Sequence, residues 1–262
     1  MTYCVGMNLR NGLVFASDSR TNAGIDYVTT YSKMHVFTPS NDRIFILLSA
    51  GNLATTQEII NRIKRDIDFS DSNDSLLRAR YMFEAAEYVG RVSLEVQQIH
   101  NPALQQAGVS GEASWILGGQ IQSQPHSLMM IYPQGNFIEA SETTPYLQIG
   151  ETKYGKPVLD RVLTYDTSLE DAAKLALVSL TSTANSNITV GAPFELSLYN
   201  GGDFSLQSRC KFEPNGEYLS ELELAWKNGL IQVFNNLPSF TKNEGQQKMD
   251  LSNRPNVVVT NV

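Results

Sequence analysis

The sequence has few of the residues that build disulfide frameworks or metal centres. Its 262 residues include two cysteines and three histidines. None of these shows the ligand spacing of a zinc site, so we expect no metal and no cofactor. Cys4 and Cys210 do not make a disulfide framework, and free thiols are the default in a reducing compartment. Cys4 lies inside a predicted strand and is interpreted as a small buried hydrophobic residue.

Long apolar runs and an excess of positive charge are also missing. No run of 18 or more apolar residues occurs, so no membrane span is predicted. The 20 Lys and Arg residues against 27 Asp and Glu residues give a net charge of −7, so nucleic acid is not an expected partner. The chain start has neither a basic segment nor a small-residue cleavage site. We therefore expect no secretory signal and a cytoplasmic protein.

The remaining composition is that of an ordinary globular domain. Charged residues make up 18% and apolar residues 42% of the chain, which is typical usage. Strand and helix patterns follow one another without a linker rich in Pro, Gly or Ser. One domain is therefore predicted over residues 1–237, followed by a polar C-terminal extension over 238–262. Three interpretations remain for Pro255 to Val259 within the extension: an edge strand, a contact to a neighbour, or a loose tail.

The first 33 residues carry the clearest local pattern. The first predicted strand has alternating apolar residues, namely Tyr3, Val5, Met7 and Leu9. A second apolar run, from Leu13 to Ala16, predicts a second strand. Asn11-Gly12 between the two runs predicts a hairpin with a type I′ turn, which needs positive φ at both central residues. Because the first strand begins at residue 2, the chain start is expected to be fixed in a sheet.

Later segments are assigned from periodicity and cap residues. A helix is predicted around Ile59 to Ile67, and Ser49-Ala50-Gly51 ends the strand before it. A loop is predicted over Ser19 to Thr30, and a strand over 113–122 that Gly118-Gly119 breaks. A long helix is predicted to begin at a cap on Asp74 or Ser75 and to end at His100 to Pro102, with His100 as its C-terminal cap. Two further helices are predicted, one over 169–183 capped by Ser168 and one over 217–235.

Thr2 offers a chemical reason for a fixed chain start. Threonine is small enough for Met1 to be removed, which leaves one residue with both a hydroxyl and a free α-amine. Such an amine has a reference pKa of ~7.7–8.0, and it can act as general base for its own hydroxyl. A nearby cation would lower this pKa, and a carboxylate would hold the cation in place. Lys33 and Asp18 are the candidates, although each alone is an ordinary charge near a turn.

Together these residues resemble the β-type subunits of the proteasome. The resemblance rests on Thr2-x-x-Val5-Gly6, on Asn11 to Arg20, on Lys33, on Ser49-Ala50-Gly51 and on Thr56-Gln57. The chain start and Ile149 to Pro157 are similar to the bacterial ancestral beta subunits of this superfamily, called Anbu. The resemblance implies an α+β fold in four layers, α-β-β-α, with two antiparallel sheets: the N-terminal nucleophile hydrolase fold. The element order, without βαβ alternation, agrees with this class.

The resemblance also implies an active site and an activity. It makes Thr2, Asp18 and Lys33 catalytic and the Gly51 N–H the oxyanion donor, at a strand-to-helix junction that suits this role. Turn geometry alone also favours a glycine there. Arg20, Asn22 and Leu53 are the implied substrate-binding residues, with Arg20 to Ala23 beside the cleft. The implied function is a threonine-type endopeptidase that acts on a peptide or protein substrate within a ring-like homo-oligomer. The substrate, the ring size and any partner ATPase or regulator stay open.

Two positions depart from the pattern of active β subunits. Gly150-Glu151-Thr152 replaces a glycine turn that contains serine, and Asn185 to Thr189 replaces an Asp-x-x-Ser element. A carboxylate at Glu151 would raise the pKa of the Thr2 amine and oppose its activation. Two alternatives therefore remain: a weakly active or inactive ring-forming scaffold, and an amidase for a small non-peptide amide.

Overall fold

The computed structural model describes residues 2–22, 28–69, 74–206 and 208–240. The chain divides into two compact units, Met1–Glu223 and Leu224–Val262. The division falls inside helix α5, Glu217–Asn235, whose bounds agree with the predicted helix over 217–235. The predicted segment 255–259 lies outside the described residues. The two large sheets, the buried clusters and the candidate site all belong to the first unit.

Two five-stranded antiparallel sheets form the centre of this unit. The first has the order β10-β1-β2-β11-β12 and the second the order β5-β6-β7-β8-β9. The strands of the first sheet are β1 (Tyr3–Leu9), β2 (Gly12–Asp18), β10 (Tyr146–Gly150), β11 (Phe194–Asn200) and β12 (Ser208–Phe212). Those of the second are β5 (Met34–Ser40), β6 (Arg43–Gly51), β7 (Ala113–Ile121), β8 (Ser127–Ile131) and β9 (Phe137–Glu139).

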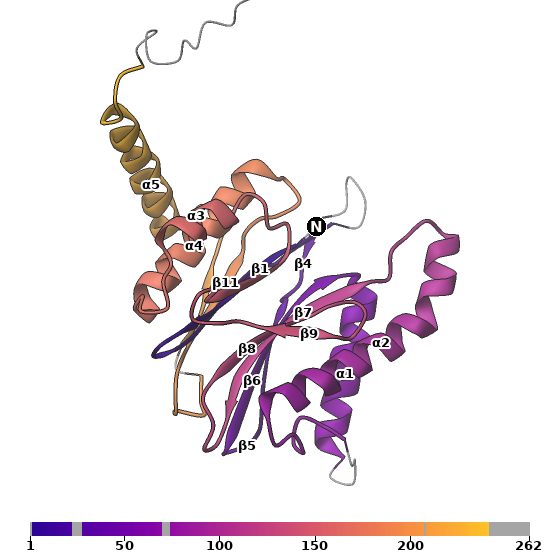
Figure 1. Ribbon diagram of the computed structural model, residues 1–262. Coiled ribbons are helices and arrows are strands. Elements are labelled where there is room, and N and C mark those ends of the chain that lie inside the picture. Colours follow the sequence, from indigo (N-terminus) through magenta and orange to yellow (C-terminus); the bar gives the residue numbers. More distant parts are fainter. Residues whose placement is uncertain (1, 23–27, 70–73, 207, 241–262) are drawn as a thin grey trace, which may run out of the picture. The chain divides into compact units, whose positions relative to one another are not determined.

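Helices cover the outer face of each sheet. In Figure 1, α1 (Leu53–Asp68) and α2 (Met82–Gln106) lie against the second sheet, and α3 (Lys156–Val162) and α4 (Leu169–Ser186) lie against the first. Three buried clusters fill the three spaces between these layers. One, with Phe15 and Ile116, lies between the sheets, and the other two lie under the helix pairs. The predicted four-layer α-β-β-α fold is confirmed.

The N-terminal hairpin is confirmed, but its turn differs from the prediction. Leu9 pairs with Gly12, so the two loop residues are Arg10 and Asn11. Neither is among the non-glycine residues with positive φ in the described chain, which excludes the predicted type I′ turn. Gly12 has another role: a Cβ there would lie 2.0 Å from the Tyr199 carbonyl oxygen of β11. The glycine is needed for close approach of the neighbouring strand.

Two further predictions need correction. The segment Ser19 to Thr30 is not a plain loop, because β3 (Arg20–Asn22) and β4 (Val28–Thr30) pair within it as a small sheet. Gly118-Gly119 does not break β7, which pairs with β6 along its whole length. A Cβ on Gly118 would lie 2.5 Å from the Phe15 ring. This glycine therefore gives the facing sheet room to pack.

Helix α2 begins and ends later than its sequence predicts. Neither Asp74 nor Ser75 caps it, and the N-cap is Tyr81 without a side-chain bond. The guanidinium of Arg43 donates to the carbonyls of Leu77 and Ala79, at 2.8 and 2.7 Å. These carbonyls are therefore held by β6 instead of by a helical turn. At the other end the helix continues through Pro102 to Gln106.

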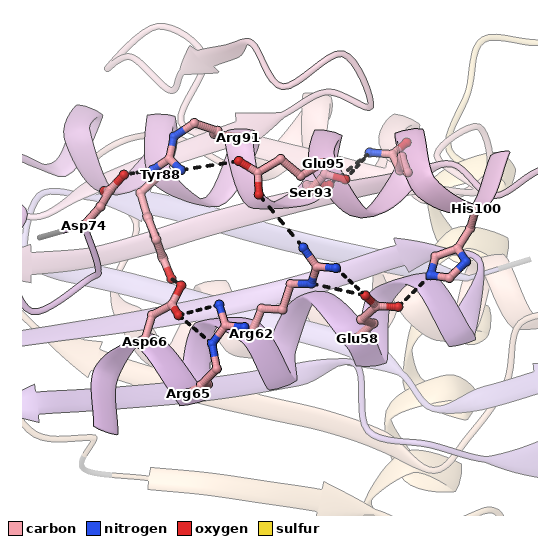
Figure 2. A network of polar contacts seen from close by, with 11 residues as sticks. Glu58, Arg62, Arg65, Asp66, Asp74, Tyr88, Arg91, Ser93, Glu95 and His100 are labelled. Carbon is pink, nitrogen blue, oxygen red and sulfur yellow. Dashed lines mark hydrogen bonds and ion pairs between the residues drawn. The ribbon is translucent and has the colours of Figure 1, made fainter. Parts of the chain in front are cut away.

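His100 joins α2 to α1 and does not cap its helix. Its Nε2 lies 2.7 Å from Glu58 Oε2, and Glu58 also accepts from Arg62 Nη2 at 2.7 Å. Figure 2 shows how these contacts continue along the two helices through Glu95 and Arg91 to Asp74. The network joins side chains that are mostly half-exposed, so each ion pair adds little to stability.

The cap of α4 agrees with the prediction. Ser168 Oγ accepts from the Asp171 N–H at 3.1 Å, and the hydroxyl donates to the Asp171 carboxylate. The helix itself extends to Ser186, three residues beyond the predicted end. With this extension, α4 ends directly before the segment 187–191.

The layer between the sheets should contribute to stability through its fully buried side chains. Phe15→Ala removes a fully buried ring and should lower the free energy of unfolding by about 3–5 kcal/mol. Val162→Ala, at a side chain that is 53% exposed, should change it by no more than about 0.5 kcal/mol. Urea denaturation of both variants checks this. Equal effects of the two changes would contradict the assignment of Phe15 to the core.

Candidate active site

Thr2 lies at the start of β1, at one end of the first sheet. The register that pairs Tyr3 with Gly150 places Thr2 opposite Glu151. The Glu151 N–H donates to the Thr2 carbonyl at 2.7 Å. Gly150 makes this approach possible: its φ is +85°, and a Cβ there would lie 1.9 Å from the Thr2 carbonyl oxygen. The chain start is therefore held by backbone contacts to the end of β10.

Asp18 and Lys33 form a buried ion pair beside the chain start. Lys33 Nζ donates to Asp18 Oδ1 at 2.6 Å and to the Arg20 carbonyl at 2.7 Å. Asp18 Oδ1 also accepts from the Tyr3 N–H at 3.0 Å, one residue after Thr2. The Gly191 N–H lies 3.3 Å from Asp18 Oδ2. One carboxylate thus bonds to the first strand, to the lysine and to the segment after α4.

The surroundings of Asp18 act on its pKa in opposite directions. Burial raises the pKa of the Asp18 carboxyl above its ordinary value, whereas the Lys33 ammonium and the amides of Tyr3 and Gly191 lower it. Three donors around one carboxylate favour its charged form. Burial also raises the pKa of the Cys4 thiol well above its ordinary range. Cys4 is fully buried, as expected of a packed hydrophobic residue.

A cavity of about 330 Å³ opens above these groups. Thr2, Lys33, Gly51, Arg20 and Leu53 line it. The wall also carries the polar or small residues Thr21, Ser32, His35, Ser49, Ala50, Thr56, Gln57 and Gly150. Gly51, with φ +124°, ends β6, and Asn52 caps α1 by accepting from the Thr55 N–H. The start of α1 thus follows directly from the glycine on the cavity wall.

Five of the seven predicted site residues meet at this cavity. Asp18 is the sixth: it lies beneath the wall and reaches the cavity through Lys33. Asn22 belongs to β3, and its side chain lies outside what the structure describes. Ala23, the end of the segment predicted beside the cleft, also lies outside the described residues.

His35, which lies in β5 two residues after Lys33, lines the same cavity. Burial, together with the charges of Lys64 and Arg209, lowers the pKa of its imidazole to about 4. The ring is therefore neutral at pH 7 and offers one donor and one acceptor.

The segment 187–191 is the part of the site that local sequence patterns miss. Asn187 ends α4, and its Nδ2 donates to Glu151 Oε2 at 2.9 Å. Arg20 Nη1 donates to the Ile188 carbonyl at 2.7 Å, and the guanidinium lies against Gly191, where a Cβ would come within 2.4 Å of it. Only the departure from the family pattern at Asn185 to Thr189 points to this segment in the sequence.

Two other classes of site find no support in the described residues. No group of three or more His, Cys, Asp or Glu side chains is placed to hold a metal ion in the ranges that the structure describes. Within the same ranges, no helix combines the length and apolar character needed to cross a bilayer.

Comparison with known proteins agrees with the fold. The family described as "Proteasome subunit" matches residues 2–197. Among solved structures, Anbu (ancestral beta-subunit) from Yersinia bercovieri is 42% identical, with a TM-score of 0.83; the match covers 91% of this chain and 99% of that chain. A search of curated proteins gives no match.

Two further structures extend this likeness. The Gly-1 mutant of Anbu from Hyphomicrobium sp. strain MC1 is 40% identical, with a TM-score of 0.86, and covers 92% of this chain and 100% of its own. The helical assembly of the Anbu complex from Pseudomonas aeruginosa is 42% identical, with a TM-score of 0.85, and covers 92% and 99%. The likeness therefore spans nearly the whole of each chain.

The contact between Gly150 and Thr2 predicts a specific sensitivity. Gly150→Ala should cost about 1–2 kcal/mol of backbone strain and a further ~1–3 kcal/mol from the clash with Thr2. Gly202→Ala is the matched control, because Gly202 has φ +95° but nothing within 4 Å of a Cβ. Urea unfolding should show the larger loss for Gly150→Ala. Equal losses would mean that Thr2 does not lie against Gly150.

Proposed function

This chain belongs to the proteasome subunit family, in its Anbu group, and on that premise we propose that it is a threonine-type amide hydrolase that cleaves peptides. The observation that carries the proposal is the Asp18–Lys33 pair, at 2.6 Å, which reaches the cavity that Thr2 and Gly51 line. Removal of Met1 would place a free amine and a hydroxyl on the same residue of this wall.

The reaction follows from these groups. Thr2 Oγ bonds to the carbonyl carbon of the substrate while the Thr2 amine takes the hydroxyl proton. The Gly51 N–H stabilises the oxyanion. The carbon–nitrogen bond then breaks, and the amine passes its proton to the leaving nitrogen. Water, deprotonated by the same amine, hydrolyses the ester and restores Thr2. Lys33, held by Asp18, favours the neutral amine that both steps need.

The proposed working form is a homo-oligomer. The Anbu complex from Pseudomonas aeruginosa forms a helical assembly, and we extend self-assembly to this chain. A scaffold without turnover is the second candidate, because the buried Glu151 carboxylate opposes activation of the amine. Light scattering together with a peptide-cleavage assay separates the two: assembly without cleavage at any pH would favour the scaffold.

The chemistry depends on Thr2 and Lys33. Intact mass should show the loss of Met1. Thr2→Ala removes the nucleophilic hydroxyl, and Lys33→Ala removes the cation that favours the neutral amine, so each should lower kcat/KM for a peptide amide by about 10²-fold or more. Lys211→Ala, at an exposed residue of β12 paired with Glu213, serves as control and should keep the activity. Retained Met1, or full turnover by Thr2→Ala, would end the proposal.

The cavity wall predicts which peptides are preferred. His35 is neutral and Ser49 and Gln57 add polar groups, so a Gln side chain before the scissile bond should be favoured over Leu. Replacing His35 and Gln57 together by Leu should lower the Gln-to-Leu ratio of kcat/KM about tenfold, the effect of roughly one lost hydrogen bond. Gln122→Leu is the control, because Gln122 is exposed and follows the end of β7 that lies away from the cavity. A wild-type preference for Leu would contradict this reading.

A further inference from the structure

A buried carboxylate lies beside Thr2 and has no part in the steps above. Glu151 directly follows β10, and only 5% of it is exposed. Its N–H donates to the Thr2 carbonyl at 2.7 Å. In an extended strand the N–H and C=O of one residue point to the same side, so the Thr2 nitrogen lies on the side that faces the backbone of Glu151.

Asn187 fixes the orientation of this carboxylate. Its Oδ1 accepts from Thr189 N–H at 3.0 Å and from Thr189 Oγ1 at 2.6 Å. These two bonds settle which end of the amide is oxygen, so Nδ2 is the end that donates to Glu151 Oε2 at 2.9 Å. The same segment bonds to Asp18 through Gly191. One short segment thus holds both carboxylates next to the chain start.

The charge of Glu151 is poorly compensated. Within the described part of the chain, its side chain meets the neutral amide of Asn187 and, at 3.6 Å, the Nζ of Lys153. The Lys153 side chain is 71% exposed, so this ion pair is weak. A buried carboxylate needs a closer cation or more donors. Release of Met1 creates a cation on the residue that faces it.

We infer that Glu151 is the counter-ion of the freed Thr2 α-ammonium and a positioning residue that holds the amine in its protonated form. The inference rests on the release of Met1 in the proposed function. An opposite charge within about 4–6 Å favours the charged form of a group. Glu151 therefore raises the pKa of the amine, whereas Lys33 lowers it.

The other charged groups at the site have partners of their own. Asp18 pairs with Lys33, and Arg20 donates to the Ile188 carbonyl. Glu195 lies 3.3 Å from Arg209, and the pKa of His35, lowered to about 4 by burial, keeps the ring neutral. Among the described residues, Glu151 is thus the carboxylate that remains available to pair with the Thr2 α-ammonium.

Because only the neutral amine accepts a proton, cleavage should be slow at neutral pH and should rise as the pH increases through the amine pKa.

The test measures the amine directly. The full chain is made behind a leader that a specific protease removes at Thr2, so the amine is free in every sample. Pulses of acetic anhydride at a series of pH values, with mass spectrometry of the N-terminal peptide, give the pKa of the Thr2 amine. Glu151→Gln should lower it by about one unit or more. Glu151→Asp, which keeps the charge, should retain part of the elevation.

The controls separate this inference from the proposed function. Glu112→Gln removes an exposed carboxylate near the site and should leave the amine pKa unchanged. Thermal melts establish that each variant is folded. Equal amine pKa values in the wild type and Glu151→Gln would overturn the inference, even if peptides are cleaved. A shifted amine pKa without cleavage at any pH would leave Glu151 as the counter-ion and overturn the proposed function instead.

Discussion

The ion pair between Asp18 and Lys33 is the constraint on which the site depends. Replacing a buried pair by apolar residues often costs little, but removing one partner leaves an uncompensated charge that costs about 3–5 kcal/mol. Here the carboxylate also accepts from Tyr3 and Gly191. A single side chain therefore aligns the first strand, the lysine and the segment after α4. Stability and the geometry of the chain start are consequences of the same contact.

Two charges act on the chain start in opposite directions. In the proposed mechanism Lys33 favours a neutral Thr2 amine, and the buried Glu151 favours a charged one. Both are fixed by contacts from distant parts of the chain: Lys33 by Asp18 in β2, and Glu151 by Asn187 at the end of α4. The pKa of the Thr2 amine, and with it the proposed activity at a given pH, thus depends on two charged groups that the fold holds in place.

Local sequence patterns predicted the strands of the N-terminal hairpin, the cap of α4 and the bounds of α5, because these depend on neighbouring residues. They failed where a distant residue decides. Arg43 of β6 holds the carbonyls that a longer α2 would use, and Gly12 and Gly118 serve contacts across strands and sheets. No local sequence pattern predicts that Thr2, Lys33 and Gly51 line one cavity, because they are far apart in the sequence. This expectation came from the family resemblance. The bond from Asn187 to Glu151 and the place of His35 on the cavity wall are tertiary contacts, which no local pattern specifies.

The position of Thr2 at the very start of β1 has an evolutionary consequence. The proposed base is a main-chain group, so no side chain supplies it, and it depends instead on a residue at position 2 that is small enough for Met1 to be released. In the proposed mechanism this base is exposed when the Met1 peptide bond is cut, once in each polypeptide. In an assembly of many copies, the number of competent centres would then equal the number of subunits that had lost Met1.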